Sequence, residues 1–135
     1  QKEHNIPFEN TGEIPEEVDK ELDYSYQDLM RTQSNTIFES HLSGWLAKDF
    51  PETLKVLLTC DFDEAMKRVS QRENISVEEA TELSKKRGVA LHNIKFKKLY
   101  GVENCFDPKY FDLVIDTTKI TPDQVLQTVL KSLQI

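Results

Sequence analysis

The sequence predicts an α/β fold, in which a mostly parallel sheet is covered on both faces by helices. Three observations lead to this prediction. Residues Lys55–Arg72 (KVLLTCDFDEAMKRVSQR) read as a buried strand, a polar turn and a helix. A second apolar strand is expected at Leu113–Thr117, and helical patterns with capping residues precede and follow the strands. The length of 135 residues suits a single domain over residues 1–135 with a core of its own.

The first regular element is expected to be a helix over about Pro15–Thr32, after an irregular stretch at residues 1–14. Pro15 suits a first helical turn, and the acidic residues behind it favour the positive end of the helix dipole. The predicted buried stripe of this helix is Val18, Leu22, Tyr26, Leu29 and Met30. β-branched and aromatic residues then predict a short strand at Thr36–Glu39, and a turn leads to a short helix at Trp45–Phe50.

The unit at Lys55–Arg72 combines a strand with positive charge. Its strand is the apolar run Val56–Leu58, and helical spacing begins at Phe62. Arg68 and Arg72 are four residues apart, so they share one face of the predicted helix. The unit is therefore suited to present positive charge to an anionic ligand.

The second half of the chain is mostly helical. A capping box at Ser76–Glu79 begins a helix expected over Val77–Arg87, and Gly88 separates it from a second helix over Val89–Tyr100. The last helix is expected at Pro122–Leu133, with Thr121 as its N-cap and Pro122 in its first turn. Strands alternating with helices in this order favour the α/β class.

The composition excludes several classes of function. A net charge of −7 argues against general binding of nucleic acid or anionic membranes, both of which need a basic face. No apolar run approaches the roughly 20 residues of a membrane span, and no signal peptide is visible, so a cytoplasmic location is expected. Cys60 and Cys105 lack metal-ligand spacing and are expected to be free thiols, and no metal site is expected.

The basic residues concentrate in one region of the chain. Nine of the 17 lysines and arginines lie there: Lys67, Arg68, Arg72, Lys85, Lys86, Arg87, Lys95, Lys97 and Lys98. One interpretation is a mobile cationic lid over a polyphosphate, because phosphoryl transfer depends on neutralising phosphate charge. The other is a solvated helical hairpin whose lysines pair with nearby glutamates. On the pattern alone both stay open.

Two further features bear on a phosphate site. His41 follows a predicted strand, so it is a candidate for phosphate contact or proton transfer, or else an ordinary surface imidazole. The four glycines are isolated from one another, and the sequence contains neither GxxxxGK[ST] nor GxGxxG. No run of consecutive glycine-rich backbone is therefore present to cradle the phosphates of ATP.

Five blocks of the chain resemble the archaeal-type cytidylate kinases and related cytidylate-kinase-like P-loop proteins. They are TGEIPEEVDKELD, FESHLSGWLAKDF, LKVLLTCDFDEAMKRVSQRENISVEEA, KKLYG and YFDLVIDTTKITPDQV, and they extend from about Thr11 to the C-terminus. The resemblance implies a P-loop-kinase fold: a parallel sheet flanked by helices, a monophosphate-binding segment and a helical lid. It implies transfer of the γ-phosphoryl group of MgATP to CMP or dCMP.

The resemblance also implies roles by position. Residues 15–35 match the monophosphate-binding segment, and residues 73–101 match the lid hairpin. The substrate-binding positions would be Glu39, Ser40, His41, Lys86 and Lys95, and the catalytic positions that contact phosphate would be Arg68, Arg72 and Arg87.

This chain departs from the family pattern in several ways. The P-loop strand and its loop are absent from the sequence, and Glu39-Ser40-His41 replaces the usual Glu-Gly-Arg. Lys86 and Lys95 stand where arginine is expected, which removes the bidentate guanidinium fork. In the family the missing strand lies between those expected here at Thr36–Glu39 and Lys55–Thr59. These two must then pair directly, leave an apolar gap or receive a strand from another chain.

Three functional interpretations follow. The chain is part of a nucleotide kinase whose ATP-binding segment lies outside this sequence, or a catalytically inactive kinase-like protein that acts as a structural or interaction subunit. In the third, it is an acidic α/β scaffold unrelated to nucleotides. Whether the chain is an enzyme depends on a P-loop being supplied, either upstream or by a partner.

Overall fold

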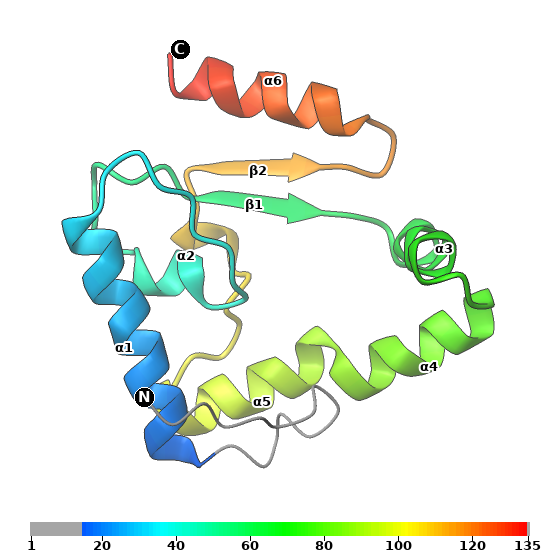
Figure 1. Ribbon diagram of the computed structural model, residues 1–135, viewed down its shortest axis with the longest axis horizontal. Coiled ribbons are helices and arrows are strands. Elements are labelled where there is room, and N and C mark those ends of the chain that lie inside the picture. Colours follow the sequence, from blue (N-terminus) through cyan, green and yellow to red (C-terminus); the bar gives the residue numbers. More distant parts are fainter. Residues whose placement is uncertain (1–14, 135) are drawn as a thin grey trace.

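A computed structural model of the chain describes residues 15–134 (Figure 1). The elements, in chain order, are α1 (Glu16–Thr32), α2 (Ser43–Leu46), β1 (Val56–Thr59), α3 (Phe62–Glu73), α4 (Val77–Arg87), α5 (Val89–Tyr100), the 3-10 turn η2 (Pro108–Tyr110), β2 (Leu113–Asp116) and α6 (Pro122–Ser132). The stretch predicted to be irregular at residues 1–14 lies outside the described residues.

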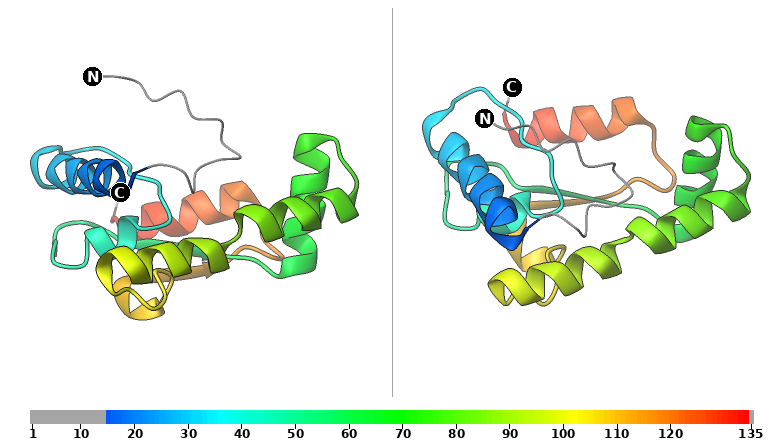
Figure 2. Two further views of the ribbon diagram at one scale, coloured as in Figure 1. Left: turned by 90° about the horizontal axis from the view of Figure 1, so that it is seen from below. Right: turned by 60° about the horizontal axis from the view of Figure 1, so that its bottom comes forward.

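The α/β class and the parallel direction of the strands are confirmed. β1 and β2 pair in parallel, with Val56 opposite Leu113 and Thr59 opposite Asp116. α6 runs alongside β2, while α3 lies beyond the carboxyl ends of both strands (Figure 1). From α3, α4 and α5 run back toward α1 on the side of the strands opposite α6, as the views in Figure 2 also show.

The prediction of a strand at Thr36–Glu39 is wrong. Residues 36–40 have no regular structure, and the side chain of Ile37 is 95% exposed. A strand is stable only when a neighbour pairs with its backbone, and β1 has no partner other than β2 among residues 15–134. Of the three arrangements expected without a central strand, direct pairing of residues 36–39 with β1 therefore does not occur.

The open edge of β1 can be identified from the hydrogen bonds of its other edge. The carbonyl oxygens of Lys55 and Thr59 accept bonds from Leu113 and Thr117 on the β2 side, at 3.1 and 2.8 Å. Alternate residues of a parallel strand bond to opposite neighbours, so Val56 and Leu58 direct their backbone groups away from β2. The Leu58 side chain is 54% exposed, and among residues 15–134 no strand pairs with this edge.

The main core lies among the helices, not under the sheet. It is formed where α1, α2 and α5 meet, from Met30, Leu42, Leu46, Ala47, Phe96, Val102 and Cys105. Gly44 of α2 is required for this packing, because a Cβ atom there would overlap the Phe111 ring. The prediction of a helix at Trp45–Phe50 placed this element too late in the chain, because α2 covers Ser43–Leu46. Within residues 15–134, no helix has the length and apolar character needed to cross a membrane.

α1 turns a different face inward from the predicted one. Met30 is buried as expected, but Leu22, Tyr26 and Leu29 are 42–50% exposed. The inward positions include the polar residues Asp19, Asp23 and Gln27, each of which has a partner on α2 or α5. These polar contacts, in place of the apolar stripe, determine how α1 is rotated.

The helix signals are confirmed where they are local. The Ser76 hydroxyl accepts from Glu79 N–H and the Glu79 carboxylate accepts from Ser76 N–H, each at 3.0 Å. Thr121 and Gln124 form the same capping box at the start of α6. α5 ends at Gly101, whose φ of 70° lies in the left-handed region that glycine adopts without strain. Cys60 and Cys105 are free thiols.

Candidate functional site

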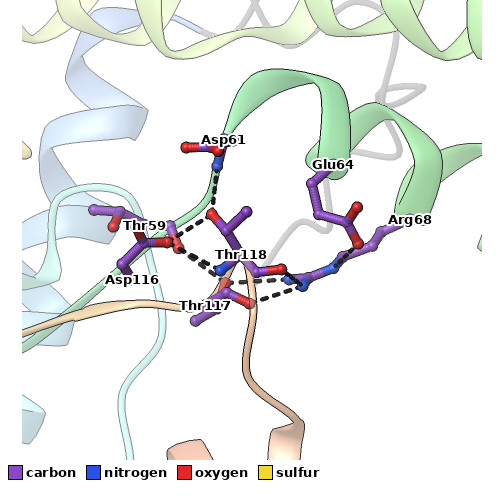
Figure 3. A network of polar contacts seen from close by, with 7 residues as sticks. All are labelled: Thr59, Asp61, Glu64, Arg68, Asp116, Thr117 and Thr118. Atoms are coloured by element: carbon purple, nitrogen blue, oxygen red, sulfur yellow. Dashed lines mark hydrogen bonds and ion pairs between the residues drawn. The ribbon is translucent and has the colours of Figure 1, made fainter.

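The carboxyl ends of β1 and β2 are joined by a network of polar contacts (Figure 3). The N–H and hydroxyl of Thr117 both donate to the Thr59 carbonyl oxygen at 2.8 Å. The Thr118 hydroxyl accepts from the Asp61 N–H at 2.9 Å and donates to Asp116 at 2.6 Å. Thr118 thereby lowers the pKa of the Asp116 carboxyl. The two loops that follow the strands are held together without any contribution from a ligand.

Arg68 extends this network to α3. Its guanidinium donates to the Thr117 carbonyl at 2.7 Å, the Thr117 hydroxyl at 3.1 Å and the Thr118 carbonyl at 3.2 Å. Its Nε donates to Glu64 at 3.2 Å, one turn earlier on the same helix. Figure 3 shows the guanidinium turned toward the Thr117–Thr118 loop. Arg68 thus braces α3 against the loop that leads into α6.

A hollow of about 390 Å³ lies beside this brace. It is lined by Leu58, Arg68, Thr117, Ile120, Pro122 and Val125. The lining is mainly apolar, with the Arg68 guanidinium as its one formal charge. The hollow borders the open edge of β1, because Leu58 belongs to both.

The other predicted catalytic arginines lie apart from Arg68. Arg72 donates to Glu73 at 2.8 Å and its side chain is 73% exposed. Arg87 and Lys86 are exposed at the far end of α4, which is 11 residues and so about 16 Å long. Figure 1 shows that end turned away from α3. The structure does not bring these cations to one point.

Lys95 is engaged with α1. Its ammonium lies 2.7 Å from the carboxylate of Asp19, a residue that is only 9% exposed. Lys98 pairs with Glu16, and the Tyr100 hydroxyl donates to Asp23 at 2.6 Å. Burial raises the pKa of the Asp23 carboxyl, with the Tyr100 hydrogen bond opposing it. These three contacts hold α1, which lies within residues 15–35, against α5, the second helix of the predicted lid hairpin.

His41 has a neighbour that the sequence did not indicate. Glu39, Ser40 and His41 are exposed in the segment before α2, and the His41 ring lies 4.1 Å from the His92 ring on α5, centroid to centroid. Partial desolvation of the two rings lowers the pKa of both imidazoles, although His41 keeps part of its surface in solvent. No local signal predicts this contact, whereas the spacing of Glu16, Asp19 and Asp23 could have indicated an acidic stripe facing α5.

The metal that accompanies ATP needs oxygen ligands, and the described residues do not gather them. Within residues 15–134, no three His, Cys, Asp or Glu side chains converge as metal ligands. Asp116, at the end of β2, is occupied by Thr118.

Comparisons with known proteins bear on the site's origin. The model of the cytidylate kinase-like family matches residues 3–119. The chain is 33% identical over 132 residues to a cytidylate kinase of Sulfolobus acidocaldarius, covering 96% of this chain and 71% of that protein. It is 34% identical to the cytidylate kinases of Sulfurisphaera tokodaii and Ignicoccus hospitalis, covering 81% and 87% of this chain. It spans 59% and 66% of those two relatives. No solved structure matched the chain.

Proposed function

The chain belongs to the cytidylate kinase-like family, and from this premise we propose that it forms the acceptor and lid part of a cytidylate-kinase-like phosphotransferase. The reaction transfers the γ-phosphoryl group of ATP to CMP or dCMP. The observation that carries the proposal is the match to a cytidylate kinase over 96% of this chain. The Mg²⁺ ion would arrive with the phosphates of ATP and neutralise their charge.

The proposed roles of the site residues follow from their exposure and their partners. The side chains of Arg72, Lys86 and Arg87 are exposed to solvent. To contact a phosphate, Arg68 would have to leave the Thr117 carbonyl oxygen, and Lys95 would have to leave the Asp19 carboxylate. Glu39, Ser40 and His41 would bind the acceptor nucleotide from the exposed segment before α2.

The ATP-binding half is proposed to dock on the open edge of β1. Support comes from the backbone of Val56 and Leu58, which points away from β2, and from the exposed Leu58 side chain. The occupant would be a strand from a segment outside this sequence or from a partner chain. Residues 1–135 alone would then be inactive, and the strand that fills the edge would carry the phosphate-binding loop.

A second function is favoured by a specific observation. Arg68 and Lys95 are occupied by acceptors within the chain, and the carboxylate that holds Lys95 belongs to the buried Asp19. Such cations stabilise structure, which suits a catalytically inactive kinase-like subunit. In that case the chain would act through protein contacts and would not turn over nucleotides.

Calorimetry on the intact protein tests the proposal, with CMP and ATP titrated separately. CMP is expected to bind, and Arg72→Ala is expected to weaken that binding by about tenfold, the effect of losing one charge-assisted contact. Lys67→Ala is the matched control, because Lys67 is an exposed cation on the same helix. If neither nucleotide binds at millimolar concentration, the kinase proposal fails and the inactive subunit stands.

A further inference from the structure

His41 and His92 form a contact between two distant parts of the chain. Their ring centroids are 4.1 Å apart, with the ring planes tilted by 37°. Phe106 meets the His41 ring edge to face at 5.7 Å, and Phe96 stacks on His92 at 6.0 Å. The pair therefore closes the segment before α2 onto α5, within a partly aromatic surrounding.

The charged groups around the pair come from three places. Glu39, on the same segment as His41, favours the protonated form of that ring. On α5, Lys95 disfavours protonation of His92, and Asp19 of α1 pairs with that lysine. The backbone carbonyl of Arg87 also favours the protonated His92. The surroundings therefore favour the pair with one added proton over the pair with both imidazoles protonated.

We propose that the His41–His92 pair is a proton-operated latch, which holds the segment before α2 against α5 when the rings are neutral and releases it when both are protonated. Two imidazolium ions at this separation repel each other strongly in a partly desolvated setting. Protonation of both rings therefore disfavours the contact between them. The latch rests on ring geometry and does not require that the chain transfers phosphate.

The sign of the pH effect follows from the direction of the shifts. Burial lowers the pKa of both histidines, so the closed state loses stability as pH falls below their ordinary value of about 6.5. Asp23, also facing α5, has a raised pKa and acts in the opposite direction, because its protonation at low pH relieves a buried charge. Acid opening of α5 therefore cannot be due to Asp23.

Amide hydrogen exchange on the intact, nucleotide-free protein tests the latch. In a series from about pH 8 to about pH 5, protection factors of the α5 amides are expected to fall by up to about a hundredfold for each pH unit between the ordinary histidine pKa and the lowered one, because opening takes up a proton at each of the two rings. His41→Phe and His92→Phe each keep a stacked ring and remove one of the two titrating groups, so each variant is expected to lose protection less steeply, by about tenfold for each pH unit, while the double variant is expected to retain protection.

A second measurement needs no variant of the pair. Imidazole resonances of His41 and His92, followed by NMR against pH, are expected to titrate below the ordinary value and to influence each other. The proposal is overturned if the two rings titrate independently at ordinary values, or if both phenylalanine variants lose α5 protection in acid as the unmodified protein does. A failure of nucleotide binding, by contrast, leaves both of these results unaffected.

Discussion

Replacing Arg68 by alanine tests whether this side chain stabilises the folded chain or serves only to contact a ligand. The guanidinium makes three hydrogen bonds to Thr117 and Thr118, and the side chain is 41% exposed. At about 1 kcal/mol for each bond, with a discount for partial exposure, Arg68→Ala is expected to lower the free energy of unfolding by about 2 kcal/mol. That is a factor of about 30 in the ratio of folded to unfolded protein.

Urea unfolding of the nucleotide-free protein measures this difference. Arg68→Lys keeps the charge but lacks the planar guanidinium, whose two terminal nitrogens bond the Thr117 hydroxyl and the two carbonyl oxygens separately, so about half of the loss is expected. Arg72→Ala is the matched control, since Arg72 lies one turn away on α3 and donates to Glu73, its neighbour in the sequence. An exposed pair of this kind contributes about 0–1 kcal/mol. Equal stability of the Arg68→Ala and Arg72→Ala variants would refute the brace.

Three further substitutions test the packing of the chain. Gly44→Ala forces a Cβ atom into the Phe111 ring and is expected to cost about 1–3 kcal/mol in thermal or urea unfolding, while an unchanged stability would contradict the close approach. Asp19→Ala leaves the ammonium of Lys95 unpaired and is expected to cost about 2–3 kcal/mol, with exchange of the α5 amides rising first, whereas the double replacement with Lys95→Ala is expected to cost less. Ile37→Ser is expected to change the stability by less than about 0.5 kcal/mol, because the side chain is almost fully exposed, and a large loss would show that residues 36–40 are covered.

Local signals in the sequence predicted most of the elements. The capping boxes at Ser76 and Thr121 and the stop at Gly101 depend only on neighbouring residues, and helices begin or end there as expected. The strand at Thr36–Glu39 failed because a strand depends on a partner strand, which lies far away along the chain or in another segment. Local propensity measures how well the residues suit a strand, and contains nothing about whether a neighbour is present.

The prediction of which face of α1 is buried failed for a different reason. Apolar periodicity placed Leu22, Tyr26 and Leu29 inward, and periodicity is reliable when the burial of apolar area contributes most to the packing energy of a helix. Here Asp19 and Asp23 find a lysine and a tyrosine on α5, and these polar contacts occupy the interface instead. The contact between His41 and His92 could not be predicted from the sequence either, because the distance between these residues is determined by tertiary packing.

Two of the cations expected to meet phosphate, Arg68 and Lys95, already hold parts of the fold together. Arg68 holds α3 to the end of β2, and Lys95 holds α5 to α1. A phosphate that recruited either one would have to replace a carbonyl or carboxylate acceptor with a stronger anion, and the freed acceptor would need water or another donor. Phosphate binding at Arg68 or Lys95, if the proposed function holds, would therefore be coupled to loosening of α3 or α5, and the contacts that stabilise the chain would set part of the free energy that the nucleotide must supply.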